Sequence, residues 1–383
     1  MTTSSSLPPT TVTSVAPGRV NLIGEHTDYN HGLCLPYAIP LACTATLTVR
    51  EDRGLTIASD KGEPWSGSLD DVSARAVTGW TSYVAGVIWA LGQDGWQVPG
   101  LDITISSTIP LGGGLSSSAA LECAVAVGLA GLLGHELDTA ARLHLAEACR
   151  RAETEYVGAP TGGMDQLASL LGAVDQAVLI DFADPTNPSA VPVTLPFSEA
   201  GLTVIVTDTG VRHSLADGDG GYAQRRAECE AAATTLGVAS LREATTADLD
   251  VLTDPVERAR TRHVVTENAR VRGVVAAVDT QDWVALGRLL EESHASLRDD
   301  FAVSCPELDA AVDAALRSGA LGARMTGGGF GGCSIALVPV AEAEQVKLSI
   351  DHVYGLRGWQ PPLHHELAPS AGAGLSPGGS APG

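Results

Sequence analysis

Apolar and polar residues alternate over short segments in the first half of the chain and recur at helical spacing in the second half. Residues 101–107 alternate along their whole length, which is typical of a strand with one buried face. Further strands are predicted at residues 41–49, 55–58, 178–180, 202–206 and 333–340. Helices with few breaking residues are predicted at residues 136–157, 222–236, 255–278 and 281–298. The pattern therefore predicts a protein of mixed strands and helices, with the longest helices in the second half.

The length of 383 residues exceeds what one ordinary core needs and predicts two packed domains. The proline-rich stretch 185–196 is a plausible boundary, so we expect an N-terminal domain at 15–200 and a C-terminal domain at 201–368. Residues 1–14 are polar and rich in Ser, Thr and Pro, which predicts a flexible leader. Residues 369–383 are almost entirely Gly, Ala, Ser and Pro, and we expect a disordered tail there.

The balance of charge restricts the kind of partner. The formal net charge is −22, from 45 acidic against 23 basic residues, so a nucleic-acid partner is not expected. A polyanionic ligand would have to be met by backbone N–H groups, a few arginines and a metal ion.

The seven cysteines are widely spaced and never form C-x-x-C, which indicates neither a disulfide framework nor a zinc site. With no signal-peptide pattern and no apolar run long enough to cross a bilayer, we expect a cytoplasmic protein without a membrane partner.

A glycine-rich segment, PLGGGLSSSA at residues 110–119, lies between a predicted strand and a predicted helix. The free N–H groups at a helix N-terminus attract anions, and glycine lets the backbone approach them closely. The three serines that follow could cap the helix or bind Mg²⁺. A mobile turn with a helix cap explains the same residues equally well, so the segment alone leaves both interpretations open. A Walker A loop is excluded because no lysine follows the glycines.

The second glycine cluster, GGGFGG at residues 327–332, formally contains G-x-G-x-x-G. A dinucleotide fingerprint opens a helix inside an early βαβ unit, whereas this cluster leads into a predicted strand. We therefore interpret it as a loop that lies close against another part of the protein.

A third segment, GRVNLIGEHTDYN at residues 18–30, concentrates charged and polar side chains around Gly24. These residues are Arg19, Glu25, His26 and Asp28. A solvated loop would account for them. A sugar site would too, because each hydroxyl that leaves water must find a new partner. Spacing alone does not decide between the two.

In this order and at these separations, the three segments resemble the three motifs of the galactokinase, homoserine kinase, mevalonate kinase and phosphomevalonate kinase (GHMP) family. Residues 18–30 are similar to the signature of the galactokinase branch. The resemblance continues at residues 162–166, 211–215, 222–226 and 293–301, and covers roughly residues 15–367. It implies an α+β fold of two domains with the active site in the cleft between them. It also implies a left-handed βαβ unit in the N-terminal domain, a rare exception to the handedness rule.

The resemblance implies an enzyme that transfers the γ-phosphoryl group of ATP to the C1 hydroxyl of galactose, the first step of the Leloir pathway. We expect a monomer with galactose and ATP as its small-molecule partners and Mg²⁺ as cofactor. Asp165 and Arg19 would flank the C1 hydroxyl, with Asp165 either as the base or as an orienting anion. The residues implied to line the rest of the sugar are Glu25, His26, Asp28, Gly162 and Tyr222. The residues implied to surround ATP are Gly112, Gly113, Gly114, Leu115, Ser116, Ser117, Ser118, Gly328 and Gly329. The residues implied to hold Mg²⁺ are Ser118 and Glu153.

Two alternatives remain open at this level. A kinase for arabinose or N-acetylgalactosamine would keep the same motifs and change the sugar. A non-catalytic sensor of galactose and ATP belongs to another functional class. Such sensors resemble galactokinases that have lost a Ser-Ala pair in the second motif, and this chain keeps Ser118 and Ala119.

Overall fold

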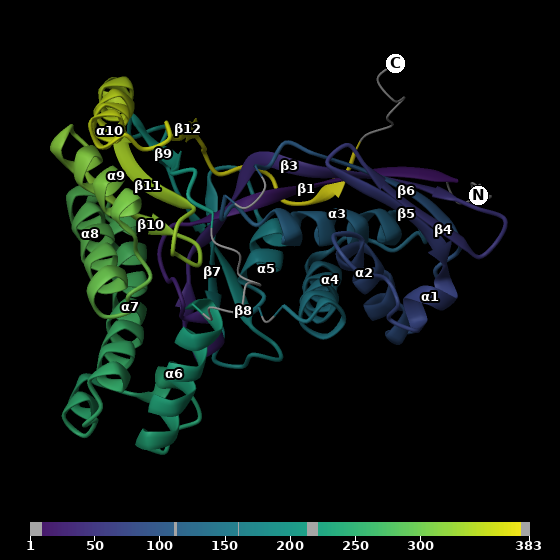
Figure 1. Cartoon of the computed structure of the whole chain (residues 1–383), viewed down its shortest axis with the longest axis horizontal. Coiled ribbons are helices and arrows are strands. Elements are labelled where there is room, and N and C mark those ends of the chain that lie inside the picture. Colours follow the sequence, from purple (N-terminus) through teal and green to yellow (C-terminus); the bar gives the residue numbers. More distant parts are fainter. Residues whose placement is uncertain (1–9, 111–112, 160, 213–220, 377–383) are drawn as a thin grey trace, which may run out of the picture.

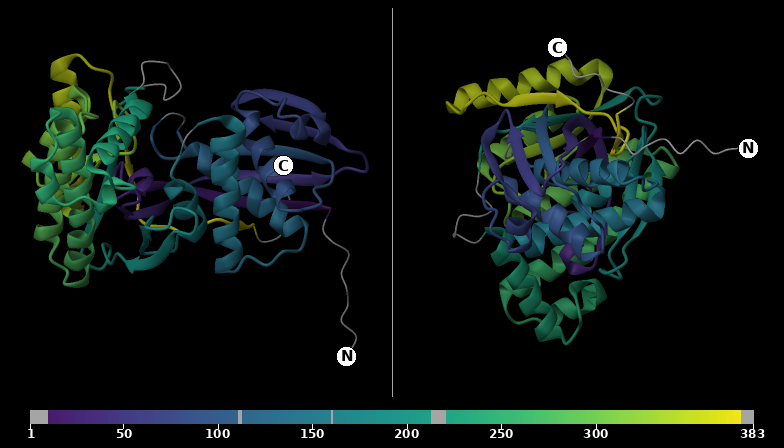
Figure 2. Two further views of the ribbon diagram at one scale, coloured as in Figure 1. Left: turned by 90° about the horizontal axis from the view of Figure 1, so that it is seen from below. Right: turned by 90° about the vertical axis from the view of Figure 1, so that its right-hand side faces the viewer.

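The structure, a computed structural model, describes residues 10–110, 113–159, 161–212 and 221–376. It has two halves side by side (Figure 1): one with a large sheet above a layer of helices, and one dominated by long helices packed against a smaller sheet. The two further views in Figure 2 show the same division. The mixture of strands and helices predicted from the sequence is confirmed.

Six strands form the sheet of the N-terminal half, in the order β13-β1-β3-β6-β4-β5. The strands are β1 (Thr11–Asn21), β3 (Pro36–Val49), β4 (Gly54–Ser59), β5 (Gly62–Ser68), β6 (Leu101–Ser107) and β13 (Gly374–Leu375). Neighbouring strands are antiparallel except for β4 and β6, which pair in parallel. The chain passes between these two through β5, α1 (Leu69–Ser73) and α2 (Thr81–Gln93), where the βαβ unit is expected. The handedness of that crossover stays a prediction.

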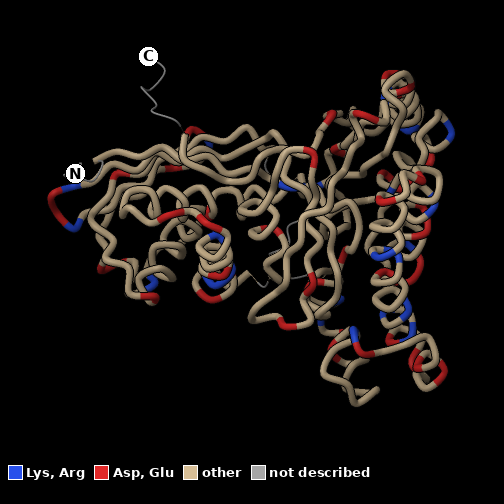
Figure 3. Tube along the Cα trace, turned by 180° about the vertical axis from the view of Figure 1, so that it is seen from behind, with Lys and Arg blue, Asp and Glu red and all other residues tan. Residues whose placement is uncertain are grey.

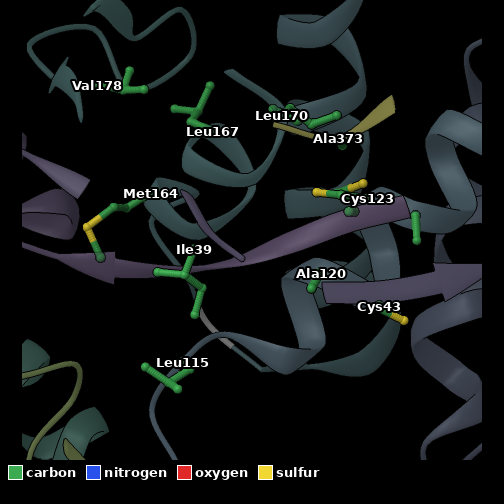
Figure 4. Packing of buried hydrophobic residues seen from close by; sticks show 14 of the residues in the cluster. Ile39, Cys43, Leu115, Ala120, Cys123, Met164, Leu167, Leu170, Val178 and Ala373 are labelled. Carbon is green, nitrogen blue, oxygen red and sulfur yellow. The ribbon is translucent and has the colours of Figure 1, made fainter. Parts of the chain in front are cut away.

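Helices cover one face of this sheet, and the other face is polar. The covering helices include α3 (Ser117–Leu132), α4 (Thr139–Arg151) and α5 (Met164–Leu171). Figure 4 shows how side chains of β3, of α3 and the loop before it, and of α5 meet in the core between the layers. On the polar face, threonine hydroxyls face each other across β1 and β3, for example Thr13 and Thr46 at 3.2 Å. The expected alternation in residues 101–107 is confirmed, because the apolar residues of β6 are buried.

A small sheet joins the two halves. It consists of β2 (Leu33–Cys34), β7 (Gln176–Asp181) and β8 (Ser189–Thr194). The proline-rich stretch predicted as a boundary contains β8, and the first strand of the C-terminal sheet begins soon after it.

The C-terminal half has an antiparallel sheet of four strands in the order β10-β11-β9-β12. Its strands are β9 (Leu202–Asp208), β10 (Gly322–Thr326), β11 (Cys333–Pro339) and β12 (Leu363–Glu366). Its helices are α6 (Gly221–Leu236), α7 (Pro255–Asp279), α8 (Trp283–Asp299), α9 (Pro306–Arg317) and α10 (Ala343–Arg357). Short 3₁₀ turns lie at Asp28–Asn30, Leu241–Glu243, Thr246–Asp250 and Val340–Glu342. The helix α7 begins where the sequence predicts it, because Asp254 caps its N–H groups and Pro255 suits its first turn.

The structure differs from the prediction at both ends of the chain. The predicted leader, residues 1–14, overlaps β1, which begins at Thr11; Ser14 is buried and donates a 2.6 Å hydrogen bond to the Ala124 carbonyl. Of the predicted tail, residues 369–383, the structure describes residues 369–376, and these are ordered. Its backbone bonds to the N-terminal half, as from Ala373 N to Ser169 O at 2.8 Å, and β13 pairs with β1. A segment of small residues thus gains order from backbone pairing rather than from side-chain volume.

Acidic residues are spread over both halves, and basic residues alternate with them along the C-terminal helices (Figure 3). The seven cysteines are free thiols. Within the described part of the chain, no helix combines the length and the apolar character that a membrane span requires.

Candidate active site

An arginine and an aspartate that are far apart in the sequence form the centre of the site. Arg19 lies on β1 beside a bulge, and Asp165 lies in the first turn of α5. The guanidinium donates to both carboxylate oxygens, from Nε to Oδ1 at 2.7 Å and from Nη2 to Oδ2 at 3.0 Å. Its Nη1 donates to the Gly114 carbonyl at 2.7 Å. The Asp165 side chain is 22 % exposed, so the predicted pair is formed and remains accessible.

Burial would lower the pKa of the Arg19 guanidinium, but the carboxylates of Asp165, Glu25 and Asp28 around it raise this pKa overall. The arginine is therefore held as a cation in a nearly closed position. Such a cation can stabilise negative charge that develops on a neighbouring ligand.

The signature loop, by which we mean residues 22–34, meets the second glycine cluster through Glu25. Its Oε1 accepts hydrogen bonds from Gly327 N at 2.8 Å and from Thr326 Oγ1 at 3.1 Å. Arg324, which is fully buried, places Nη2 3.4 Å from the same oxygen. Glu25 therefore connects two of the three motifs that the sequence singled out.

His26 stands among aromatic rings in the same loop. Its Nδ1 lies 2.9 Å from the hydroxyl of Tyr29, and its ring centroid lies 5.4 Å from Tyr222 and 4.7 Å from Phe301. Burial, together with the charge of nearby His263, lowers the pKa of His26 to about 3, so the ring is neutral at physiological pH. Its Nε2 is buried without a hydrogen-bond partner among the described residues, although the Gly328 backbone lies beside the ring. A buried polar atom of this kind is suited to a ligand hydroxyl.

Asp28 and Gly162 lie in direct contact. A side chain at position 162 would place its Cβ 2.2 Å from Asp28 Oδ2, so only glycine fits there. Burial, with added repulsion from Asp165 and Glu25, raises the pKa of Asp28 to about 6. Tyr222, at the start of α6, has its ring 5.5 Å from that of Tyr29. The five predicted sugar residues are thus brought together around the signature loop.

The two glycine segments face each other. A Cβ at Gly327 would lie 3.4 Å from the Gly114 carbonyl, and Cys333 places its sulfur 2.8 Å from the Gly113 carbonyl. Gly329 abuts the Val303 backbone, where a Cβ would lie 2.3 Å from the carbonyl oxygen. The interpretation of residues 327–332 as a close-packed loop is confirmed, since β11 follows them. Of the predicted ATP residues, Gly112 lies outside the described residues.

The serines after the glycines have different surroundings. Leu115 is buried and its carbonyl accepts from Arg19 N at 3.2 Å. Ser116 stands at the start of α3 without capping it; its hydroxyl donates instead to Asp165 Oδ2 at 2.6 Å. The cap interpretation is therefore wrong for Ser116. Ser117 begins the helix, and Ser118 lies close enough to Glu153 to lower the pKa of that carboxyl.

Glu153 belongs to a buried carboxylate group that the sequence only partly revealed. It lies in a single π-helical turn, Ala152–Val157, that continues α4, and such turns are frequent at functional sites. Gln166 Nε2 donates to Glu153 at 2.7 Å and to Glu122 at 3.0 Å. Burial, followed by repulsion from Asp165, raises the pKa of Glu153 to about 7, and burial raises that of Glu122 well above its usual range. Glu122 was missed as a site residue, although a lone glutamate in an apolar helix was the available signal.

Arg212 is a further residue beside the glycine segments that sequence reasoning did not place in the site. It forms two 2.7 Å hydrogen bonds to Asp208, whose Oδ2 would lie 3.3 Å from a Cβ at Gly113. The neighbouring Thr209 bonds through its backbone N–H to the Gly332 carbonyl at 3.0 Å. The site therefore offers a second cation close to the predicted phosphate position.

Comparison with known families agrees with this arrangement. Three family models match the chain. Those described as "GHMP kinases N terminal domain" and "GHMP kinases C terminal" match residues 82–173 and 274–355, and the one described as "Galactokinase galactose-binding signature" matches residues 3–49. Among curated relatives, the galactokinase of Streptomyces coelicolor is 45 % identical over 94 % of this chain and 92 % of its own. That of Canis lupus familiaris is 43 % identical over 88 % of this chain and 86 % of its own.

Solved structures extend the similarity to the fold. The Lactococcus lactis galactokinase complexed with galactose superposes with a TM-score of 0.87 at 32 % identity, covering 96 % of this chain and 95 % of that one. The mevalonate kinase of Methanococcus jannaschii shares the fold with a TM-score of 0.69 at 18 % identity, covering 96 % and 100 % of the two chains. The two-domain α+β architecture expected from the sequence is thereby confirmed. The chain belongs to the galactokinase family of the GHMP kinases.

Proposed function

We propose that this chain transfers the γ-phosphoryl group of ATP to the C1 hydroxyl of galactose. The observation that carries the proposal is the position of the Arg19–Asp165 pair. It lies where the first glycine segment meets the helix that carries Asp165, with Glu25 and Asp28 close enough to raise the pKa of Arg19. A sugar held by the signature loop would thus present a hydroxyl between an anion and the phosphate-binding backbone. This is the in-line positioning that phosphoryl transfer requires.

In this proposal Asp165 receives the C1 hydroxyl as a hydrogen-bond donor and takes its proton as the O–P bond forms. Phosphoryl transfer passes through a loose transition state, so a late proton transfer to a carboxylate is sufficient. Arg19 holds both oxygens of Asp165 and remains charged, which fixes the carboxylate and stabilises negative charge beside it. The variant in which Asp165 only orients the hydroxyl uses the same geometry.

The sugar contacts follow from the free polar atoms of the signature loop. Neutral His26 has an unpartnered Nε2, and ionised Asp28 can accept hydrogen bonds from hydroxyls. Glu25 has Oε1 committed to Gly327 and Thr326, which leaves Oε2 for the ligand. These groups suit a polyhydroxylated ligand, because each hydroxyl removed from water finds a partner.

The residues also fit Mg²⁺ as cofactor. Mg²⁺ in kinases is usually bound by one or two protein oxygen ligands together with substrate phosphates and water. Ser118 lies beside Glu153, a buried carboxyl whose pKa burial and repulsion from Asp165 raise to about 7, and the two would supply a hydroxyl and a carboxylate oxygen to the ion. Among the described residues no cluster of three or more His, Cys, Asp or Glu side chains is placed to hold a metal. When bound, the ion neutralises charge on the phosphates.

An assay that couples ADP release to galactose, with product analysis by phosphorus NMR, tests the proposal. Galactose 1-phosphate is the expected product. Faster turnover of arabinose or N-acetylgalactosamine would overturn the choice of sugar. Measurable galactose binding without ADP release would favour the sensor, against which the retained Ser118-Ala119 pair argues. We also propose a monomeric, cytoplasmic enzyme, and size-exclusion chromatography with light scattering tests the monomer.

A further inference from the structure

One helix of the C-terminal half holds the backbone of the signature loop. Three side chains of α7, which we call the α7 clamp, bond to backbone atoms of the loop. Glu267 Oε1 accepts from Gly24 N at 3.0 Å, and Asn268 Oδ1 accepts from Leu33 N at 2.8 Å. His263 Nε2 lies 3.1 Å from the carbonyl oxygen of the residue after Gly24. His263 and Glu267 are one turn apart and share a face of α7, and Asn268 lies next to them around the helix, so the loop wraps over two adjacent sides of α7.

Glu267 is itself fixed from two sides. It is fully buried; Arg270 Nε donates to its Oε2 at 2.7 Å, and Ser293 Oγ donates to its Oε1 at 2.7 Å. Burial would raise the pKa of Glu267, but the charges of Arg270, His263 and Arg324 lower it to about 2. The carboxylate is therefore always ionised, and an ionised acceptor strengthens the bond from Gly24 N.

His263 has a defined tautomer. A carbonyl oxygen can only accept, so Nε2 carries the hydrogen that Glu25 O receives. Burial lowers the pKa of His263 to about 4, so the ring is neutral at neutral pH, and its Nδ1 lies 3.0 Å from Ser296 Oγ, whose hydroxyl donates to Asp300 at 3.1 Å. The ring thus connects the loop to α8.

The signature loop also packs closely against α7. Gly24 has a φ of 98°, and a Cβ there would lie 2.4 Å from Leu33 O and 3.1 Å from Val271 Cγ2. At Gly32, a Cβ would lie 2.6 Å from Asn268 Oδ1. Side chains at either position would force the loop away from the helix, so the loop and the clamp define each other's positions.

The clamp reaches the sugar side of the site and not the side where phosphoryl transfer takes place. The loop that it holds carries the predicted sugar contacts Glu25, His26 and Asp28. Between α7 and the Arg19–Asp165 pair or the first glycine segment, the described part of the chain shows no hydrogen bond or ion pair. A change in the clamp should therefore alter the affinity for the sugar while the catalytic pair remains in place.

We propose that the α7 clamp positions the galactose site, and that its three residues are positioning residues which set the affinity for the sugar. This inference rests on the proposed function of the signature loop. It adds residues from a C-terminal helix, more than 200 positions away from the loop in sequence, to the determinants of sugar binding.

The test compares three variants of the full chain. Asn268→Ala removes the acceptor for Leu33 N, and Asn268→Asp keeps an acceptor oxygen at the same place. Arg258→Ala is the matched control, because Arg258 also lies on α7 and bonds to backbone carbonyls, but to those of Leu249 and Leu252. Steady-state kinetics give kcat and both KM values, and calorimetry gives the Kd for galactose.

For Asn268→Ala we expect the KM and Kd for galactose to rise about tenfold, since a buried N–H loses its partner. The kcat and the KM for ATP should stay within about twofold, and Asn268→Asp should recover most of the loss. An equal change in Arg258→Ala, or a parallel rise in the KM for ATP, would overturn the clamp. Should the alanine variant not fold, Asn268→Ser provides the same comparison. An inactive wild type would refute the proposed function. The clamp would still be tested, because calorimetry measures the Kd for galactose without turnover.

Discussion

Ser116 and Asp165, 49 positions apart in the sequence, are joined by a 2.6 Å hydrogen bond from the serine hydroxyl to Oδ2 of the carboxylate. The same oxygen accepts from Arg19 Nη2 at 3.0 Å, so Asp165 is oriented both by β1 and by the first glycine segment. Ser116 reaches it from a left-handed backbone conformation, with a φ of 59°. The segment expected to bind ATP therefore also fixes the group expected to receive the sugar hydroxyl.

Removing this hydroxyl without straining the backbone is a direct test of the relationship. Ser116→Gly suits the left-handed conformation and deletes only the hydrogen bond. We expect kcat to fall about tenfold, since a hydrogen bond to a charged group contributes about 1.5–3 kcal/mol and the arginine still holds Asp165. Gln281→Gly, at another left-handed position with a φ of 54° and outside the predicted site, is the control. Equal kcat values for the two variants would show that Ser116 has no part in orienting Asp165.

Asp165→Asn is nearly isosteric and removes both charge and basicity. If Asp165 receives the C1 proton, kcat should fall by about 10² or more, or ~3 kcal/mol of barrier, while the KM for galactose changes little. Thermal melts should confirm that the variant is folded. A folded variant that keeps kcat within a few-fold of wild type would leave Asp165 as a sugar contact only.

The raised pKa of Asp28 predicts a pH dependence. A carboxylate accepts hydrogen bonds from sugar hydroxyls in its ionised form, and burial moves its pKa to about 6. The kcat/KM for galactose, which reports on the free enzyme, should therefore fall as the pH drops through about 6 and reach a plateau above it. In Asp28→Asn this acid limb should disappear from a profile measured between pH 5 and 8. Persistence of the limb would assign it to another group.

Chelation tests the metal assignment. Excess EDTA should abolish turnover and Mg²⁺ should restore it, because few cations surround the predicted phosphate position. Ser118→Ala should raise the Mg²⁺ concentration needed for half-maximal rate and lower kcat, with little effect on the Kd for galactose. An unchanged Mg²⁺ requirement in this variant would remove Ser118 from the metal site.

The free energy of unfolding should depend on pH through the protonation of Glu153. Its pKa rises from 4.5 to about 7 in the folded state, so between these values the folded chain binds the extra proton. The contribution of Glu153 to stability is therefore complete below pH 4.5 and is lost as the pH rises towards 7. Glu153→Gln cannot titrate, so the difference in unfolding free energy between wild type and variant should shift in favour of the variant over this range. Denaturant titrations without Mg²⁺ at pH 5 and pH 7 measure it, and a difference independent of pH would contradict the shifted pKa.

The sequence alone determined the elements and the chemistry of this protein. The alternating pattern at residues 101–107 and the capped, proline-led start of α7 are local signals, because a strand face and a helix end depend on neighbouring residues. The three motifs indicated the family, and the resemblance, with its further stretch at residues 162–166, implied the residue types of the site, including the Arg19–Asp165 pair. These signals lie within short stretches of chain and can be read without knowing its path.

Only the tertiary structure decided which distant groups meet. Ser116 was as suited to capping α3 as to contacting Asp165, and nothing near Asn268 indicates that it accepts a hydrogen bond from Leu33. The small residues at positions 370–376 become ordered because β1 and α5 offer them backbone partners. The physical reason is the same in each case. A hydrogen bond between residues far apart in the sequence depends on where the folded chain brings its backbone, and a local sequence pattern does not determine that position.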